Sequence, residues 1–333
     1  MRMIVRPGTR TRAAGLVLAA FAAVAGGQAA RAACSVGKLA ELSVTMQGRR
    51  PMTSVQINGH NLNLIVDNGR SLSQLNSPLA DELKLSPHVL RNWRIKSAGE
   101  DNRLQMATVD VSVAGTTMPG VDFVVAPMLY ANGAIGRNVL NVSGVEYDLA
   151  KGVVRLFKTT GCENTDMAYW ANGSGFFTVD TRFMPERLHP VILEAQVNGQ
   201  PVKVMFDTGA PTSSLSFAAA ERLGLRRDGP GVQETQIEVH EHGKIERAWL
   251  TPIGSFKIGD EEIASTRLLV GPSARDIDML LGADFFLAHH VYWARDQNRL
   301  YLTYNGGPVF DSRGQPFVIE PVDEGAPSTG HGN

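Results

Sequence analysis

Two aspartates stand in matching surroundings in this sequence. Asp67 and Asp207 each follow an apolar run and precede a glycine by two positions. The flanking segments match at a constant offset of 140 residues, Val55–Gly59 with Ala195–Gly199 and Leu64–Gly69 with Val204–Gly209. A glycine at that position lets other backbone approach the carboxylate closely, and two carboxylates brought together can share a single proton. The pattern therefore predicts acid–base chemistry by a pair of aspartates.

The duplication extends beyond the aspartates and is expected to govern the whole fold. Leu79–Leu85 aligns with Ala219–Leu225, and Ala134–Leu140 matches Leu280–Phe286 at an offset of 146. The later pair of segments contains an apolar-apolar-Gly element, which ends in Ile135-Gly136 in the first copy and in Leu281-Gly282 in the second. Each copy is expected to contain a strand, an Asp-x-Gly turn, a short helix, a variable middle, the apolar-Gly element and a closing strand.

The composition is typical of a globular protein, since 43% of the 333 residues are apolar and 20% are charged. The formal net charge is −1 and no segment forms a basic stripe, so we expect no nucleic-acid partner. After the N-terminal region, no stretch approaches the roughly 18 apolar residues that a membrane-spanning helix requires. We therefore expect no membrane span once that region is removed.

The N-terminal residues have the layout of an export signal. Four arginines between Arg2 and Arg12 precede an apolar or glycine run from Ala13 to Ala25, which is too short to span a membrane. Ala30-Arg31-Ala32 then offers a small-x-small cleavage site. We predict a signal peptide over residues 1–32 and export to the periplasm or the exterior, with an N-terminal membrane anchor as the alternative.

The chain contains two cysteines, Cys34 and Cys162. In an oxidising compartment they are candidates for one disulfide that ties the mature N-terminus to the end of the first copy. A lipid-modified Cys34 and two free thiols are the alternatives.

Most of the chain is expected to form short strands. Asn58-Gly59 and Asn198-Gly199 lie between strand-like runs and are typical of tight hairpins. Helical signals are short, over Leu79–Leu85 and over Phe217–Leu225. We therefore expect an all-β fold. The predicted organisation is a signal peptide (1–32), an N-terminal lobe (33–159), a connection (160–188), a C-terminal lobe (189–305) and a flexible tail (306–333).

The second copy resembles the active-site turn of aspartic proteases. The resemblance rests on Phe206-Asp207-Thr208-Gly209-Ala210, and on Leu280-Leu281-Gly282, which is similar to the apolar-apolar-Gly element behind that turn. With Asp67-Asn68-Gly69 and Ile135-Gly136 in the first copy, the chain looks like a pepsin-like or fused retropepsin-like enzyme. The resemblance covers residues 51–159 and 189–305. It implies a bilobal acid-protease-like fold with two pseudo-two-fold-related β-barrel lobes and short helices.

The same resemblance implies an aspartic-type endopeptidase for peptide or protein substrates, with no cofactor and no metal. Asp67 and Asp207 would share the general acid and base roles, and the aspartic-protease dyad is itself the standard worked case of such a pair. In the family, the threonine after the aspartate hydrogen-bonds across the dyad, and Thr208 is the candidate for this role. The remaining turn residues are Asn68, Gly69, Gly209 and Ala210. We expect a monomer.

The first copy departs from the family pattern at two positions. Asn68 replaces threonine, although its amide is still able to donate across the interface. Arg70 stands where a small residue is expected, and a guanidinium that reached Asp67 would favour the ionised carboxylate. Arg70 is therefore a candidate modulator of proton binding by the pair. The open alternatives are an Arg70 that points outward, a catalytically inactive peptide-binding protein, and a homodimer that pairs Asp207 of each chain.

The family also covers its cleft with a flexible hairpin, which excludes water from the substrate. Val239–Ile245 in the second copy has a glycine near its centre, and Ala98–Asn102 is the equivalent segment of the first copy. Either segment is a candidate for this flap.

Overall fold

The computed structural model describes residues 33–97, 100–128, 130–182, 190–241, 244–271, 276–310 and 323–324. The described residues from Ala33 onward belong to one compact unit. The predicted signal peptide lies outside the described residues. Within the part of the chain that is described, no helix is long and apolar enough to cross a membrane.

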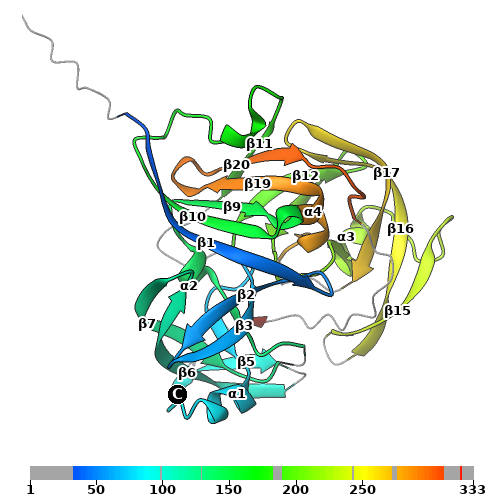
Figure 1. Ribbon diagram of the computed structural model, residues 1–333. Helices are drawn as coiled ribbons and strands as arrows, with labels where there is room; N and C mark the ends of the chain where they lie inside the picture. The colour runs from blue at the N-terminus through cyan, green and yellow to red at the C-terminus, as the bar shows by residue number, and fades with distance from the viewer. Residues whose placement is uncertain are drawn as a thin grey trace, which may run out of the picture. The chain divides into compact units, whose positions relative to one another are not determined.

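The described residues are mostly strand, and both copies contain their elements in the same order (Figure 1). The first copy contains β2 (Arg50–Ile57), β3 (His60–Val66), β4 (Ser73–Leu75), α1 (Ser77–Glu82), β5 (His88–Ser97), β6 (Glu100–Val113), β7 (Thr116–Val125), β8 (Gly133–Ile135) and α2 (Arg137–Leu140). The second contains β12 (Ile192–Val197), β13 (Gln200–Phe206), β14 (Ser214–Ser216), α3 (Phe217–Arg222), β15 (Gln233–Glu241), β16 (Lys244–Ile258), β17 (Glu261–Gly271), β18 (Met279–Leu281) and α4 (Ala283–Ala288). The predicted all-β, bilobal fold class is confirmed.

Asn-Gly pairs form the hairpin turn that leads to each aspartate. Asn58 and Gly59 join β2 to β3 with φ values of 49° and 80°, and Asn198 and Gly199 join β12 to β13 with φ values of 51° and 76°. Left-handed values at both central residues are typical of a type I′ turn, whose twist matches that of the flanking strands. These turns set the register of the strands, and the last residue of β3, Val66, is fully buried.

The strand that ends at each aspartate pairs in parallel with the apolar-Gly element. β3 pairs with β8 through Val66, and β13 pairs with β18 through Phe206. β4 and β14 complete the two arrangements, because each is antiparallel to the apolar-Gly strand and parallel to a longer strand, β7 or β17. The chain is therefore fixed from both sides at the points where Asp67 and Asp207 begin their loops.

A third sheet joins the two copies (Figure 1). Adjacent strands of this sheet are antiparallel. Their order across the sheet is β1 (Ser35–Gln47), β10 (Val153–Thr160), β9 (Gly144–Asp148), β19 (His289–Ala294), β20 (Arg299–Tyr304) and β11 (Phe177–Arg182). β9 belongs to the first copy and β19 to the second, so backbone hydrogen bonds join the halves at the middle of this sheet. Side chains reinforce the junction, since His290 Nε2 lies 2.8 Å from Glu146 Oε1 and both residues are buried.

Cys34 and Cys162 form a disulfide, with Cα atoms 4.4 Å apart. The bond connects the residue before β1 to the segment after β10, across a sequence separation of 128 residues. β1 and β10 also pair from Ser35 with Thr160 onward. The disulfide therefore fastens one edge of the joining sheet.

We expect reduction of this disulfide to lower the free energy of unfolding by about 2–5 kcal/mol, because the crosslink restricts the unfolded chain. Denaturant unfolding with and without a reductant measures the loss. The Cys34→Ser/Cys162→Ser double variant provides the permanently open form, and its unfolding midpoint should match that of the reduced protein. A double variant as stable as the oxidised protein would contradict this expectation.

Candidate active site

The two aspartate loops lie against each other at the ends of β3 and β13. A Cβ atom added to Gly69 would lie 2.4 Å from Asp207 Cγ, and one added to Gly209 would lie 2.3 Å from Asp67 Cγ. Each carboxyl group therefore rests on the glycine of the other loop, and the two carboxyl groups are neighbours. A side chain at either glycine would occupy the same space as a carboxyl group, so the contact requires glycine.

Reciprocal hydrogen bonds join the loops beneath the carboxyl groups. The Thr208 amide donates to Asn68 Oδ1 at 2.8 Å, and the Asn68 amide donates to Thr208 Oγ1 at 3.1 Å. The Thr208 hydroxyl donates to the Val66 carbonyl at 2.7 Å. Thr208 is fully buried and Asn68 is nearly so. The side chain of Asn68 is an acceptor toward the opposite loop, whereas the sequence suggested a donor.

Matching backbone hydrogen bonds reach the two carboxyl groups. Asp67 Oδ1 accepts from the amides two and three residues later, both at 3.1 Å. Asp207 Oδ1 accepts from the corresponding amides at 2.9 and 3.2 Å. Such bonds favour an ionised carboxylate. At Asp207 they are outweighed, because burial and then the charge of Asp67 raise the pKa of Asp207 to about 7.

The halves differ most at Arg70, whose side chain is 9% exposed. The Arg70 Nε donates to Asp67 Oδ2 at 3.0 Å, and a second guanidinium nitrogen donates to Gln74 Oε1. Of the two orientations that the sequence left open, the structure therefore has the one that points toward Asp67. The residue at the corresponding position of the second half is Ala210, which carries no charge.

A serine behind each loop supports the apolar-Gly element. In the first half, Ser73 Oγ accepts from the Gly136 amide at 3.0 Å and donates to Asn138 Oδ1 at 2.8 Å. In the second half, Ser213 makes the same two bonds, at 2.9 Å to the Gly282 amide and 2.6 Å to Asp284. The sequence pattern predicted no such role for these serines, although both pairs recur at the offsets of the duplication. Ile135 and Leu281, the apolar residues of these elements, are fully buried.

Comparison with protein families agrees with this geometry. A family described as aspartyl protease matches residues 53–139, and one described as gag-polyprotein putative aspartyl protease matches residues 193–288. Each match contains one aspartate loop and one apolar-Gly element. The chain belongs to the retropepsin-like aspartic proteases. No curated protein matches it significantly.

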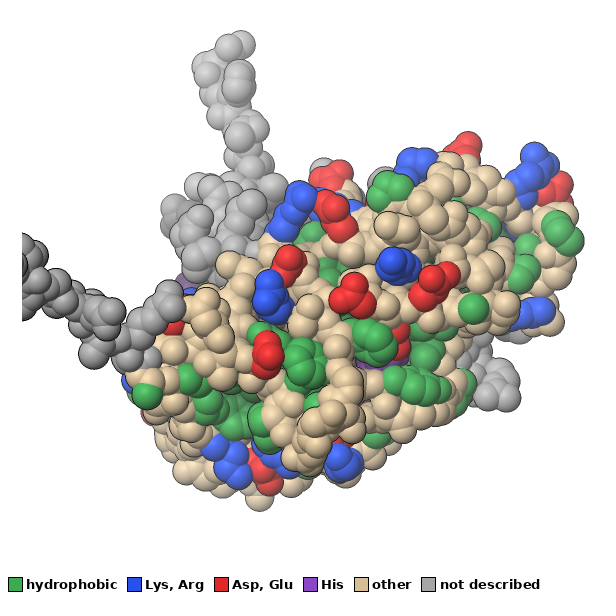
Figure 2. All heavy atoms as spheres, turned by 90° about the horizontal axis from the view of Figure 1, so that it is seen from above, with side chains coloured by type: hydrophobic (Ala, Val, Ile, Leu, Met, Phe, Trp, Pro, Cys, Tyr) green, Lys and Arg blue, Asp and Glu red, His purple; other side chains and the backbone are tan. Residues whose placement is uncertain are grey.

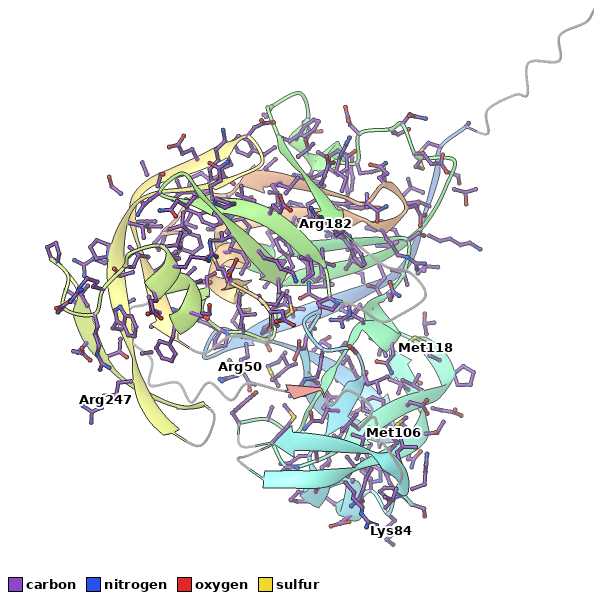
Figure 3. The ribbon with its side chains drawn as sticks, turned by 180° about the vertical axis from the view of Figure 1, so that it is seen from behind. Arg50, Lys84, Met106, Met118, Arg182 and Arg247 are labelled. Atoms are coloured by element: carbon purple, nitrogen blue, oxygen red, sulfur yellow. A yellow bond between two sulfur atoms is a disulfide. The ribbon has the colours of Figure 1, made fainter. Side chains whose placement is uncertain are left out.

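Tyr130 extends the candidate site of this family member beyond the two loops. It lies between β7 and β8, where burial raises the pKa of its hydroxyl and the charges of Arg70 and Asp67 also act on it. Arg50, labelled in Figure 3 at the start of β2, has its guanidinium 4.1 Å from the centre of the Tyr130 ring. The sequence pattern does not reveal this pair, because the two residues come from segments that are far apart and carry no repeated signal.

Long hairpins occupy the positions that the sequence suggested for the family's flap. β5 pairs with β6 in the first half, and β15 pairs with β16 in the second. The hairpin tips, residues 98–99 and 242–243, lie outside the described residues, so the candidate flap segments are described only in part. The strand β21 (Asp323–Glu324) pairs with the edge of β5 at Ile95 and Lys96.

Histidine and acidic side chains elsewhere form pairs. His289 Nε2 lies 2.9 Å from Glu261 Oε1, in addition to the pair of His290 with Glu146. Over the described residues, no three His, Cys, Asp or Glu side chains are grouped so as to hold a metal ion.

We expect Gly69→Ala to destabilise the protein by about 1–3 kcal/mol, because the new methyl group overpacks against the Asp207 carboxyl group. Gly175→Ala is the matched control, since a Cβ atom there has no neighbour within 4 Å, and it should change stability by less than about 0.5 kcal/mol. Denaturant unfolding of both variants measures the difference. Equal stability of the two variants would mean that the loops are not in this contact.

The raised pKa of Asp207 predicts a pH-dependent effect of Asp207→Asn. Asp207 has a pKa of about 7 in the folded protein against 3.8 for an unperturbed aspartate, so between pH 3.8 and pH 7 only the folded state holds this proton. The protonated Asp207 therefore stabilises the fold fully below pH 3.8, and this stabilisation is lost as the pH rises to about 7. The stability of Asp207→Asn relative to wild type should therefore increase from pH 4 to pH 8.

Chemical unfolding at several pH values tests this expectation, with Asp228→Asn as the control. Asp228 is exposed and its bond to Arg226 lowers its pKa, so its stabilising contribution is lost on acidification instead. The relative stability of the control should change little or fall as the pH rises. A flat profile for Asp207→Asn would contradict a buried, protonated Asp207.

Proposed function

We propose that this chain is an aspartic-type endopeptidase that hydrolyses peptide bonds with a water molecule activated by Asp67 and Asp207. The observation that carries the proposal is the contact of each carboxyl group with the glycine of the opposite loop. Two carboxyl groups this close hold one proton between them, because charging both is unfavourable. A pair with one ionised and one neutral member supplies both a base and an acid.

The proposed reaction needs only this pair and water. The ionised carboxylate accepts a proton as the water oxygen bonds to the peptide carbonyl carbon. The neutral carboxyl group donates its hydrogen bond, and then its proton, to the carbonyl oxygen that becomes negative. Collapse of the tetrahedral intermediate breaks the C–N bond, and a proton passes to the leaving nitrogen. The amine and the carboxyl product then leave the pair with one proton, as at the start.

Peptides and proteins are the proposed substrates, as the family implies. Acidic and basic side chains are interspersed over the face shown in Figure 2, and the formal net charge of −1 gives no reason to propose a nucleic-acid partner. The hairpins β5–β6 and β15–β16 are the proposed flaps that would exclude water around a bound peptide. A monomer is the proposed active species, since the reciprocal bonds of Asn68 and Thr208 lie within one chain.

Export is the proposed localisation. The basic and apolar pattern of residues 1–32 and the disulfide between Cys34 and Cys162 support an oxidising compartment, either the periplasm or the exterior.

A second function is favoured by one observation. The Arg70 guanidinium is hydrogen-bonded to Asp67 at a position where the family pattern has a small residue, which suits a peptide-binding protein of the same fold that has lost catalysis. A homodimer that pairs Asp207 of two chains is not favoured, because the Asp207 loop is already joined to the Asp67 loop.

Incubation with a mixed peptide library at pH 4 to 8, followed by mass spectrometry, distinguishes these functions. We expect cleavage by the wild type, and a loss of about 10²–10⁴ in rate for Asp67→Asn and for Asp207→Asn, because each removes an acid–base group. Asp228→Asn, on the surface, should cleave at the wild-type rate. Peptide binding without cleavage would favour the inactive protein, and full activity of Asp67→Asn would favour the homodimer.

A further inference from the structure

The two halves of the candidate dyad are almost equivalent in their surroundings. Each carboxyl group accepts two backbone amides on Oδ1 and rests on the opposite glycine. If these were the only contacts, the shared proton would bind the two aspartates about equally. The two aspartates differ because the guanidinium of Arg70 contacts Oδ2 of Asp67 at 3.0 Å.

Arg70 is held in this position from two sides. Besides Asp67, the guanidinium contacts Gln74 Oε1, and Gln74 Nε2 donates to the carbonyls of Ala126 and Pro127 at 3.3 and 3.4 Å. Arg70 and Gln74 are 8% and 2% exposed, so both are fixed by packing as well as by hydrogen bonds. The Arg70 guanidinium is therefore linked through Gln74 to the segment that follows β7.

The second half cannot repeat this arrangement. The positions that correspond to Arg70 and Gln74 at the offset of 140 are Ala210 and Ser214. Neither Ala210 nor Ser214 carries a positive charge, so neither can contact Asp207 as Arg70 contacts Asp67. The difference between the halves is therefore built into the sequence at two positions.

Other charged and titratable groups also lie near Asp67. Arg137 lies behind the loop, where it donates to the Asn68 carbonyl at 2.8 Å and to Ser71 Oγ at 2.7 Å. Tyr147 is buried against the Asn68 side chain, and burial raises its pKa, so it stays neutral. Tyr130 interacts electrostatically with Arg70, Asp67 and Asp207, and the guanidinium of Arg50 lies over the Tyr130 ring. The Arg70 guanidinium is hydrogen-bonded directly to the Asp67 carboxylate, at 3.0 Å.

We propose that Arg70 is a positioning residue that fixes the negative charge of the dyad on Asp67 and leaves the shared proton on Asp207. This inference rests on the proposed function for its catalytic meaning. Asp67 then always takes the proton of the water, and Asp207 always donates to the peptide carbonyl. Gln74 assists by holding the guanidinium in place.

A dyad with its charge on Asp67 and its proton on Asp207 suits catalysis at pH values up to neutral. A general acid is most effective when its pKa lies near the working pH, and the pKa of Asp207 is about 7. A neighbouring cation also favours the singly ionised pair in mild acid. The dyad therefore keeps one charge and one proton over a wide range of pH.

Carbon-13 NMR of the aspartate carboxyl groups tests the inference without relying on catalysis. The two resonances are assigned with Asp67→Asn and Asp207→Asn, and the pH titration is compared among wild type, Arg70→Ala, Arg70→Lys and Gln74→Leu. In the wild type, Asp67 should keep the chemical shift of a carboxylate while Asp207 titrates near pH 7. In Arg70→Ala, the resonances of Asp67 and Asp207 should shift over the same pH range. The doubly protonated pair should lose its first proton at a pH about one to three units higher than in the wild type.

Three of the variants show whether the result depends on the charge and position of the guanidinium. Arg70→Lys should keep the wild-type order of titration, and Gln74→Leu should give an intermediate shift because the guanidinium loses one support. These milder variants also remain informative if Arg70→Ala folds poorly, since removal of one partner from a buried ion pair is destabilising. Arg70→Ala/Ala210→Arg moves the guanidinium to the other loop and should exchange the titration behaviour of the two aspartates.

Cleavage of the peptide library by the same variants separates the two inferences. Loss of activity in mild acid for Arg70→Ala, with Arg70→Lys retaining it, supports the role of Arg70. Identical carboxyl titrations in the wild type and all Arg70 variants would overturn that role, even if peptides are cleaved. The expected titrations without any cleavage by the wild type would support the charge assignment and reject the peptidase.

Discussion

Two carboxyl groups placed side by side repel when both are ionised, and the structure holds them together through contacts that lie beneath them. Asn68 and Thr208 exchange hydrogen bonds across the interface, and each carboxyl group rests on the glycine of the opposite loop. Behind these loops, the parallel pairs β3–β8 and β13–β18 fix the strand ends. The joining sheet then keeps the two halves in register, because β9 and β19 pair directly. These strand pairings and the joining sheet together hold the two aspartate loops in contact.

The electrostatics of the site follow from the same contact. Burial and the charge of Asp67 raise the pKa of Asp207, so one proton is retained where two carboxylates would otherwise be charged. The nearby cation of Arg70 compensates the remaining negative charge at this buried position. A buried charge of either sign without a partner would be costly, and the pair, its proton and the guanidinium together avoid that situation.

Much of this arrangement was predictable from the sequence. The offset of 140 residues predicted two equivalent units, and the Asn-Gly pairs predicted the hairpins that lead to the aspartates. The direction of Arg70 was not predictable, because a long side chain follows whichever partners the fold supplies, here Asp67 and Gln74. The contact between Arg50 and Tyr130 is also invisible in the sequence, since it joins distant segments outside the repeated pattern. The serines behind the loops did carry a signal, because Ser73 and Ser213 are separated by the same offset as the aspartates.

The joining of both halves in one polypeptide has a consequence for Arg70. In an assembly of two identical chains, any residue beside one carboxyl group is necessarily present beside the other, so a guanidinium would occur twice. Two such cations would favour the ionised form of both aspartates equally, so the two carboxyl groups would not differ in proton affinity. Covalent duplication followed by divergence at residues 70 and 210 permits a cation on one side alone. A fused chain can thereby assign different chemistry to two groups that symmetry would keep the same.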